Sequence, residues 1–280
     1  MIDEPKPLSE SIPRLHRRWG WIVKDAVITV LLWGYFTAGF LFLFAPFYLL
    51  ALIFAKDRRS AFQGLNSLFY RGFFLLCRLL IPRHRWEIHP SVRTIRSAVV
   101  ICNHISYLDS ILLVSLYSRH TTIAKDRLFA IPIFGDVLKL SGYLPSSGRG
   151  RYADLLLDSL NAISASLEKG GNVIVFPEGT RSRDGHVGRL HKGVFKIAKY
   201  CKAPIKVLAI TNTEKLFPPG KFLFNTCIDN VIGLKMVAEF LPEYDSGPSV
   251  LSDLTADVEA LLDKAANPVN FNPSCEETLT

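Results

Sequence analysis

Two polar residues with complementary chemistry, His104 and Asp109, stand close together in the stretch NHISYLDS at residues 103–110. The apolar run 98–102 directly before this stretch has the composition of a buried strand. An imidazole that donates its Nδ1–H to a carboxylate keeps Nε2 free to accept a proton. The pair is therefore a candidate general base. The alternative is that Asp109 only caps a helix that begins in this stretch.

No serine nucleophile of the usual kind accompanies this pair. Serine hydrolases of the α/β type carry their serine in a G-x-S-x-G turn, and the chain has no such stretch. A His–Asp pair without its own nucleophile can instead deprotonate a hydroxyl group that belongs to a substrate. A helix beginning at Ser106 or Ser110 would turn the chain so that the carboxylate comes back toward the imidazole.

A second polar stretch, FPEGTRSRDG at residues 176–185, overlaps the end of the apolar run 171–176. It combines arginines and hydroxyl groups with a glycine, and arginine forks together with backbone amides bind phosphate well. A solvated charged loop is the alternative for this stretch taken by itself. Upstream, Arg149 and Arg151 open a region of helical spacing, and the N-terminus of a helix also favours an anion.

Strands and helices alternate from residue 93 onward. Strands are expected over 97–102, 121–125, 171–176 and 205–210, and helices over 151–169, 192–201 and 249–266. This alternation predicts an α/β sheet with helices on its faces. Ligands of such sheets gather beyond the carboxyl ends of the strands, so the two polar stretches can face one cleft.

The composition is that of a basic and apolar chain. Its 280 residues carry a formal net charge of +8, and the mean hydropathy is +0.22. Such a chain suits an anionic lipid surface, a phosphorylated substrate or nucleic acid. Nucleic acid is disfavoured as a partner, because basic runs interleaved with aromatic residues occur only beside the N-terminal apolar segment.

The five cysteines form no CxxC or Cys/His cluster, so neither a zinc site nor a disulfide framework is expected. Reduced thiols facing the cytoplasm are the simpler interpretation.

The N-terminal apolar segment, residues 26–55, contains thirty residues without a formal charge and is long enough to enter a membrane. As one straight helix it would be about 45 Å long, against about 30 Å of hydrocarbon. Gly34, Gly39 and Pro46 offer places to bend. Basic residues on both flanks favour a bent or re-entrant helical pair with both ends cytoplasmic. A single tilted span and a buried core helix are the alternatives.

The following stretch, residues 61–82, places Arg71 and Arg78 on one helical face among Phe and Leu. This pattern is typical of a helix in the membrane interface, or of a core helix with arginines that extend to water. We expect three parts of the chain: a membrane-anchoring helical region over 1–85, an α/β domain over 86–268, and a loose tail over 269–280.

The order of the two polar stretches resembles that of the glycerolipid acyltransferase family. An H-x4-D stretch after a strand is followed about seventy residues later by Phe-Pro-Glu-Gly-Thr-Arg-Ser, and the resemblance covers residues 95–215. Within the family, the chain is most similar to bacterial 1-acylglycerol-3-phosphate acyltransferases. The resemblance implies an α/β fold, with a mixed sheet flanked by helices and an N-terminal helical membrane anchor.

The resemblance also implies an activity. A fatty acyl group would move from acyl-CoA or acyl-carrier protein to the free sn-2 hydroxyl of 1-acylglycerol 3-phosphate, giving phosphatidic acid. His104 would be the general base and Asp109 its partner. The residues implied to bind substrate are Glu178, Gly179, Thr180 and Arg181, together with Lys125 and with Arg149 or Arg151.

Membrane lipids, the lysophosphatidate acceptor and the acyl donor are the implied partners, with no nucleic acid, no cofactor and no metal. The implied location is the inner, cytoplasmic membrane, with the active site facing the cytoplasm. Two other activities stay open. The acceptor could be another lysolipid, such as a lyso-ornithine lipid or a lysophospholipid, or the protein could be a membrane-anchored lipid or thioester hydrolase.

Overall fold

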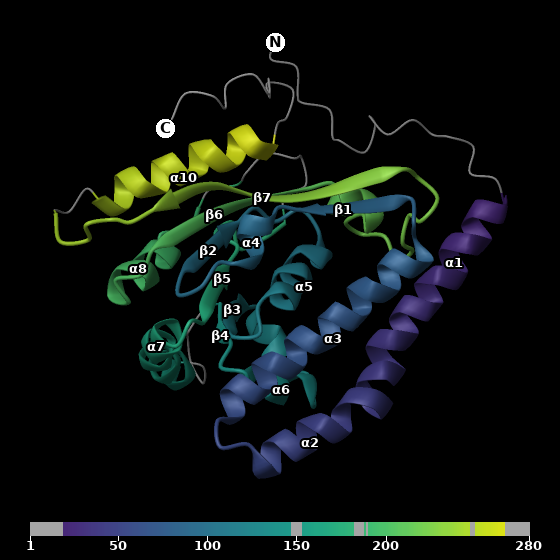
Figure 1. The fold of residues 1–280 in the computed structure, drawn as a ribbon, viewed down its shortest axis with the longest axis horizontal. Coiled ribbons are helices and arrows are strands. Elements are labelled where there is room, and N and C mark those ends of the chain that lie inside the picture. Colours follow the sequence, from purple (N-terminus) through teal and green to yellow (C-terminus); the bar gives the residue numbers. More distant parts are fainter. Residues whose placement is uncertain (1–18, 147–152, 182–187, 189, 247–249, 267–280) are drawn as a thin grey trace.

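A seven-stranded sheet with the strand order β1-β7-β6-β2-β5-β3-β4 forms the centre of the protein (Figure 1). The computed structural model describes residues 19–146, 153–181, 188, 190–246 and 250–266. All neighbouring strands are parallel except β6 and β7, so the expected mixed sheet is confirmed. The strands are β1 (His84–Ile88), β2 (Val99–Cys102), β3 (His120–Ala124), β4 (Leu144–Pro145), β5 (Asn172–Val175), β6 (Ile205–Thr211) and β7 (Asn230–Phe240).

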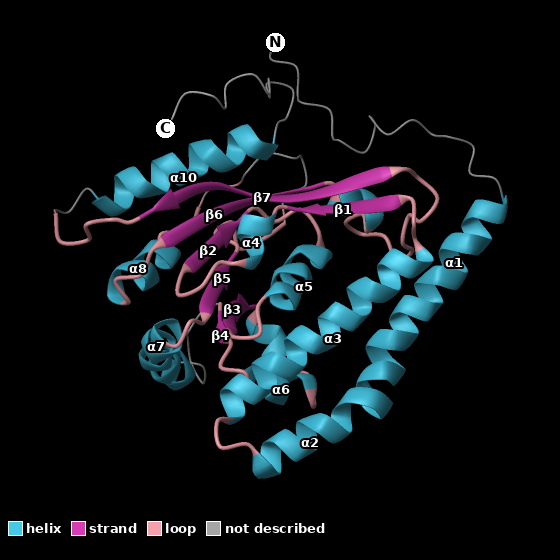
Figure 2. Cartoon of the chain, in the orientation of Figure 1, coloured by secondary structure: helices cyan, strands magenta, loops and turns pink. Residues whose placement is uncertain are grey.

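Helices lie on both faces of this sheet (Figure 2). The α-helices are α1 (Trp19–Gly34), α2 (Ala45–Phe54), α3 (Arg58–Leu80), α4 (Pro90–Arg93), α5 (Tyr107–Leu116), α6 (Phe134–Leu140), α7 (Ala153–Glu168), α8 (Gly193–Tyr200), α9 (Thr213–Leu216) and α10 (Val250–Ala266). A π-helix, η2 (Tyr35–Phe44), joins α1 to α2, and a short 3-10 helix, η3 (Asp126–Ala130), follows β3.

Strand β2 shows how side-chain alternation builds the two layers. Val100 and Cys102 pack into a core that includes residues of α1, α3, α4 and α5. Val99 and Ile101 pack on the opposite face, in a core shared with α7, α8 and α10. Because both faces are covered, the strand is apolar throughout, as expected of a parallel strand in the middle of an α/β sheet. Its carboxyl end can then leave the sheet at a fixed position.

The long apolar segment forms one bent helix from Trp19 to Phe54. The expected helical pair is therefore not contained within residues 26–55, because the limb that runs back beside the bent helix is α3 (Figure 1). The π-helix η2 lies where the helix bends, and such irregular turns commonly kink a helix. In η2, the Tyr35 hydroxyl donates to the Phe69 carbonyl at 2.7 Å, and a side chain at Gly72 would collide with that hydroxyl. The helical hairpin, which the bent helix forms with α3, is thus held by a hydrogen bond at a close approach that a side chain at residue 72 would disturb.

Helix α3, which covers most of residues 61–82, is a core helix on its inner face, and its place in a membrane interface stays a prediction. Its inner face buries Phe73 and Cys77, the Arg71 Nε donates to the Ser115 carbonyl at 2.7 Å, and the Arg78 guanidinium lies over the Trp86 ring. Its outer face leaves leucines exposed. The expected boundary between residues 85 and 86 falls inside β1. The division of the chain into an anchor and a catalytic domain stays a prediction.

A buried polar network joins the helical hairpin to the edge of the sheet. His120 is fully buried, and its Nδ1 donates to the Tyr117 carbonyl at 2.8 Å. Its Nε2 therefore accepts from the Tyr143 hydroxyl at 2.6 Å. That hydroxyl accepts from the Asn66 side chain of α3, which in turn accepts from the Tyr48 hydroxyl of α2. The network requires a neutral imidazole.

We expect this network to make stability depend on pH between about 6.5 and 4. Burial lowers the pKa of His120 from 6.5 to about 4 in the folded protein. The unfolded chain therefore binds a proton that the folded chain excludes, and the free energy of unfolding falls as the pH falls through this window, by about 3 kcal/mol in total. Denaturant midpoints in detergent, measured from pH 4 to pH 7, check this. His120→Gln should flatten the dependence, and an unchanged slope in that variant would contradict the assignment.

Candidate active site

His104 and Asp109 meet just beyond the carboxyl end of β2. The His104 Nδ1 lies 3.0 Å from the Asp109 Oδ2. A carboxylate only accepts hydrogen bonds, so Nδ1 carries the proton and Nε2 has the free lone pair. Among the described residues, no protein group bonds to Nε2, and the imidazole is partly exposed, with the Phe176 ring packed beside it. The geometry is that of a base whose tautomer and ring orientation are fixed.

Asp109 also caps α5, so the two interpretations of this residue hold together. Ser106 is the N-cap of α5, and its backbone N–H donates to the Asp109 Oδ2 at 2.7 Å. The Ile105 N–H donates to the same oxygen at 2.7 Å. The carboxylate is fully buried, and these bonds compensate the cost of burying its charge. The same contacts that begin the helix therefore hold the carboxylate against His104.

Glu178 joins the second polar stretch to the first. Strands β2 and β5 are parallel neighbours, so the residues that follow them leave the sheet at one edge. The Glu178 Oε1 accepts from the His104 backbone N–H at 3.0 Å, and its Oε2 accepts from the Gly188 N–H at 3.4 Å. Burial raises the pKa of this carboxyl. Glu178 thus positions the loop of His104, and its direct contact with a substrate stays a prediction.

Arg181 reaches the start of α5. Its guanidinium lies 3.5 Å from the centroid of the Tyr107 ring, and its Nη1 is buried without a hydrogen-bond partner in the described part of the chain. Gly179 adopts a positive φ of 65°, which allows the tight turn before Arg181, and Thr180 is exposed in that turn. A guanidinium held in place with an unused donor suits an anion such as phosphate.

Of the other expected substrate contacts, only Lys125 lies in the described part of the chain. Lys125 follows β3 at the same edge of the sheet and is exposed, and no contact joins it to His104 or Arg181 among the residues described. Arg149 and Arg151 lie outside the described residues. No group of three or more His, Cys, Asp or Glu side chains in the described ranges could hold a metal ion.

Two residues that sequence reasoning missed complete the site. The Asn103 side chain forms two hydrogen bonds with the backbone of Ile210, at 2.8 and 2.9 Å, and so ties the catalytic loop to β6. Thr213, fully buried at the start of α9, donates its hydroxyl to the Asp109 Oδ1 at 2.6 Å. Thr213 is remote from the motif in sequence. Its position just after a strand whose carboxyl end lies at the same edge was the available signal.

Removing the Thr213 hydroxyl is expected to slow the reaction. Asp109 loses a hydrogen bond to a charged acceptor in the Thr213→Val variant, and a loss of this kind corresponds to about tenfold or more in kcat/KM. Steady-state kinetics of the purified variant check this. Thr213→Ser keeps the donor and should retain most of the activity. Equal losses in both variants would show that the methyl packing, and not the hydrogen bond, matters.

Known proteins are similar in sequence to the part of the chain that carries the active site. The family described as "Acyltransferase" matches residues 85–211. A chloroplastic 1-acyl-sn-glycerol-3-phosphate acyltransferase of Brassica napus is 34% identical over 122 residues, which are 44% of this chain and 35% of the relative. A 1-acyl-sn-glycerol-3-phosphate acyltransferase of Chlamydomonas reinhardtii is 31% identical over 229 residues, 78% of this chain and 63% of the relative. The matches thus span between about a third and two thirds of these relatives.

A solved structure shares the fold. The crystal structure of the 1-acyl-sn-glycerophosphate acyltransferase PlsC from Thermotoga maritima superposes with a TM-score of 0.66 at 22% sequence identity, over 88% of this chain and 95% of that chain. The α/β fold, with its mixed sheet and flanking helices, is therefore that of a known acyltransferase. Residues 85–211, which carry the His104–Asp109 pair and Glu178, therefore match the acyltransferase family in sequence.

Proposed function

We propose that the protein transfers a fatty acyl group from acyl-CoA or acyl-carrier protein to the sn-2 hydroxyl of 1-acylglycerol 3-phosphate, giving phosphatidic acid. The observation that carries this proposal is the 3.0 Å contact between His104 Nδ1 and Asp109 Oδ2, with Nε2 left open to a substrate. The activity named for the Brassica napus and Chlamydomonas reinhardtii relatives supports the choice of acceptor.

The proposed reaction uses the substrate hydroxyl as the nucleophile. The His104 Nε2 accepts the hydroxyl proton as the oxygen attacks the thioester carbonyl carbon. The tetrahedral intermediate then collapses, the carbon–sulfur bond breaks, and the thiolate takes the proton back from the imidazolium. Asp109 keeps the imidazole in the productive tautomer and stabilises its positive charge. Among the described residues, no serine hydroxyl bonds to His104, which agrees with a route that needs no acyl-enzyme.

We propose that Arg181 binds the phosphate of the acceptor. In the Arg181→Ala variant, the apparent KM for the phosphorylated lysolipid should rise by at least tenfold, because a charged hydrogen bond is lost. The KM for the acyl donor should stay within about twofold. Initial rates measured while one substrate is varied at saturating amounts of the other separate the two constants. A rise in the donor KM alone would contradict this role.

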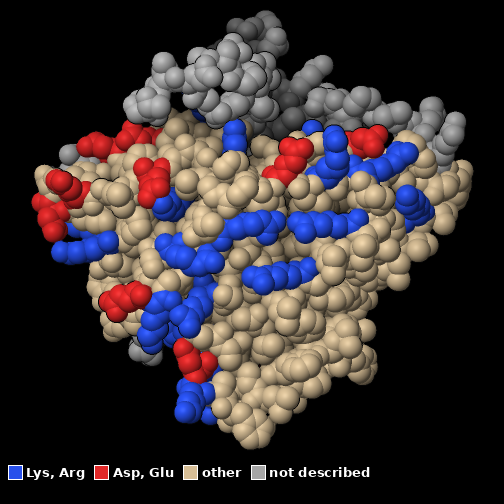
Figure 3. All heavy atoms as spheres, viewed as in Figure 1, with Lys and Arg blue, Asp and Glu red and all other residues tan. Residues whose placement is uncertain are grey.

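Membrane association belongs to the proposal as well. Only 11% of the most apolar window of the bent helix Trp19–Phe54 is buried within the protein. Figure 3 shows that the surface at the lower right, over α2 and the part of α1 that follows Lys24, lacks the charged side chains that gather elsewhere on this face. A large uncharged apolar surface of this kind marks a membrane or partner contact. We propose that it enters the inner membrane with both flanks on the cytoplasmic side, so that the acceptor reaches His104 from the bilayer.

An acyl-transfer assay with a panel of acceptors tests the proposed function. Purified protein in mixed micelles should esterify 1-acylglycerol 3-phosphate, with lysophosphatidylcholine, lysophosphatidylethanolamine and a lyso-ornithine lipid as competitors, and acyl-CoA and acyl-carrier protein as donors. Preference for a different lysolipid would change the acceptor that we propose but not the type of reaction. Thioester cleavage at the same rate with and without any lysolipid would contradict transfer and indicate a hydrolase.

A further inference from the structure

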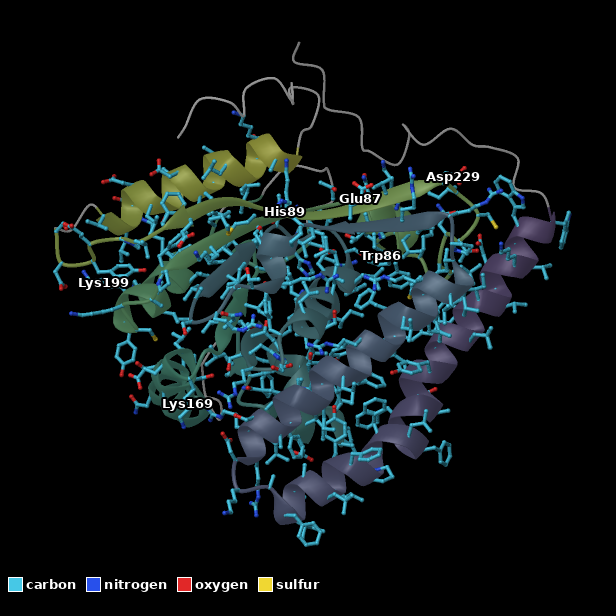
Figure 4. The ribbon with its side chains drawn as sticks, viewed as in Figure 1. Trp86, Glu87, His89, Lys169, Lys199 and Asp229 are labelled. Carbon is cyan, nitrogen blue, oxygen red and sulfur yellow. The ribbon has the colours of Figure 1, made fainter. Side chains whose placement is uncertain are left out.

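A hollow of about 620 Å³ lies at the same edge of the sheet as His104, beyond β6, β7 and β1. Strands β2 and β6 are parallel, so their carboxyl ends share this edge. Strand β7 is antiparallel to β6, and β1 is parallel to β7, so both begin there. Asp229, which lines the hollow, lies at this end of the sheet near the start of α1 (Figure 4). The volume is within the range of ligand sites.

The charged side chains that line this hollow are mostly basic. Arg83, Arg85 and Lys215 line it together with one acid, Asp229. The Arg83 Nη1 donates to the Cys227 carbonyl at 2.7 Å, which fixes this guanidinium in place. The side-chain nitrogens of Arg85 and Lys215 form no hydrogen bond or ion pair with another described residue, and both side chains are exposed. Their charges are free to meet a phosphate group, and arginine is well suited to bind one.

One wall of the hollow is the turn that also holds the catalytic carboxylate. Asn212 and Lys215 line the hollow, and Thr213 between them bonds to Asp109. The turn is fixed to the start of β7, because the Asn212 side chain donates to the Val231 carbonyl at 2.8 Å and the Asn230 side chain donates to the Asn212 carbonyl at 2.9 Å. The hollow therefore lies directly behind a rigid part of the active site.

The strand order places the reacting atoms between two anion-binding positions. Arg181 follows β5, His104 follows β2, and the hollow lies at the end of β6 and at the starts of β7 and β1, which is their order across the sheet. Acyl transfer brings together two substrates that each carry phosphate: the acceptor, and a donor whose thioester is linked through pantetheine to phosphate. If Arg181 takes the phosphate of the acceptor, the donor phosphates must lie elsewhere, and the hollow is a basic site on the other side of His104.

We propose that this hollow binds the phosphate groups of the acyl donor, an inference that rests on the proposed function. The shared chemistry is the phosphate ester of the pantetheine arm, which acyl-carrier protein and CoA both carry, and CoA adds the phosphates of its nucleotide. Binding at the hollow holds the donor while the thioester reaches the acceptor hydroxyl at His104. Arg85 and Lys215 determine affinity for the donor and do not touch the reacting atoms.

The test combines charge-removing variants with shortened donors. Arg85→Gln, Lys215→Gln and the double variant are assayed with acyl-CoA, acyl-carrier protein and acyl-pantetheine, which has no phosphate. We expect kcat/KM for acyl-CoA to fall about tenfold in each single variant, with the acceptor KM unchanged. Turnover of acyl-pantetheine should not change, because this donor never used the site. If kcat/KM falls with acyl-carrier protein as well, the hollow binds the phosphate of the pantetheine arm. If kcat/KM falls with acyl-CoA alone, the hollow binds the nucleotide phosphates.

Lys169 provides the matched control. It lines a second basic hollow at the opposite edge of the sheet, with Arg96 and Arg119, and Figure 4 shows it far from Asp229. Lys169→Gln removes the same charge and should leave every donor unaffected. Equal losses for acyl-pantetheine and acyl-CoA in the Arg85 and Lys215 variants, or no loss at all, would overturn the inference alone. Failure of the wild-type protein to transfer from any donor would overturn the proposed function, and the inference with it.

Discussion

His104→Ala is expected to lower the rate of acyl transfer by about 10²–10⁴-fold, the usual contribution of a general base. The variant should remain folded, because the imidazole is partly exposed and the bonds of Asp109 to the start of α5 do not involve it. Single-turnover rates with saturating donor and acceptor measure the chemical step, and circular dichroism and thermal melting in detergent measure the fold.

A second histidine serves as the control for this substitution. His89 is exposed at the start of α4, just after the carboxyl end of β1, which lies at the opposite edge of the sheet from His104. His89→Ala should leave the transfer rate within about twofold of the wild type, although a helix cap is lost and the melting temperature can fall slightly. Near-normal turnover by His104→Ala would remove His104 from the mechanism.

Asp109→Asn should damage both the rate and the fold. The carboxylate accepts from the His104 Nδ1, two backbone N–H groups and the Thr213 hydroxyl, all within 3.0 Å. An asparagine has one acceptor oxygen, and its NH₂ group would face donors. It can also stabilise the wrong tautomer of His104, an effect that cost about 10⁴-fold in a serine protease with the same pair. Leaving buried donors unpaired costs a further 1–3 kcal/mol or so of stability.

The two variants can be told apart by stability. Asp109→Asn should lose several degrees in melting temperature, whereas His104→Ala should lose little, and both should be nearly inactive. An Asp109→Asn protein with wild-type stability and a reduced rate would show that the cap on α5 does not depend on the charge. A stable and active variant would contradict both roles of Asp109.

Much of the site could be predicted because its motifs are short and local. Ser106, Asp109 and His104 lie within one turn of chain, so hydrogen-bonding chemistry alone brings them together. The strand before them was recognisable because both its faces are apolar. Glu178 was expected to bind substrate, and its bond to the His104 backbone was missed because it depends on which strands are neighbours.

The parts that could not be predicted depend on contacts distant in sequence. Strand β7 was missed, although it is long, because its burial alternates only partly and one of its two partners, β1, lies far away in the chain. Thr213 acts on Asp109 across a sequence separation of 104 residues. The return limb of the helical hairpin was expected inside the apolar run, because hydropathy gives the length of a segment but not the partner against which it folds.

The bent N-terminal helix has one face that packs into the protein core and one face that is exposed. Ile28 and Leu32 of α1 lie in the same core as Leu108 and Leu112 of α5, while Phe42 and Phe54 point outward and are mostly exposed. A bilayer that covers the outer face binds the folded chain in preference to the unfolded one, and so acts thermodynamically as a ligand of the native state. In the membrane proposed for it, the lipid then shares in holding the core beside His104. The measured stability becomes a property of protein and amphiphile together, and changing the detergent amounts to changing a component of the fold.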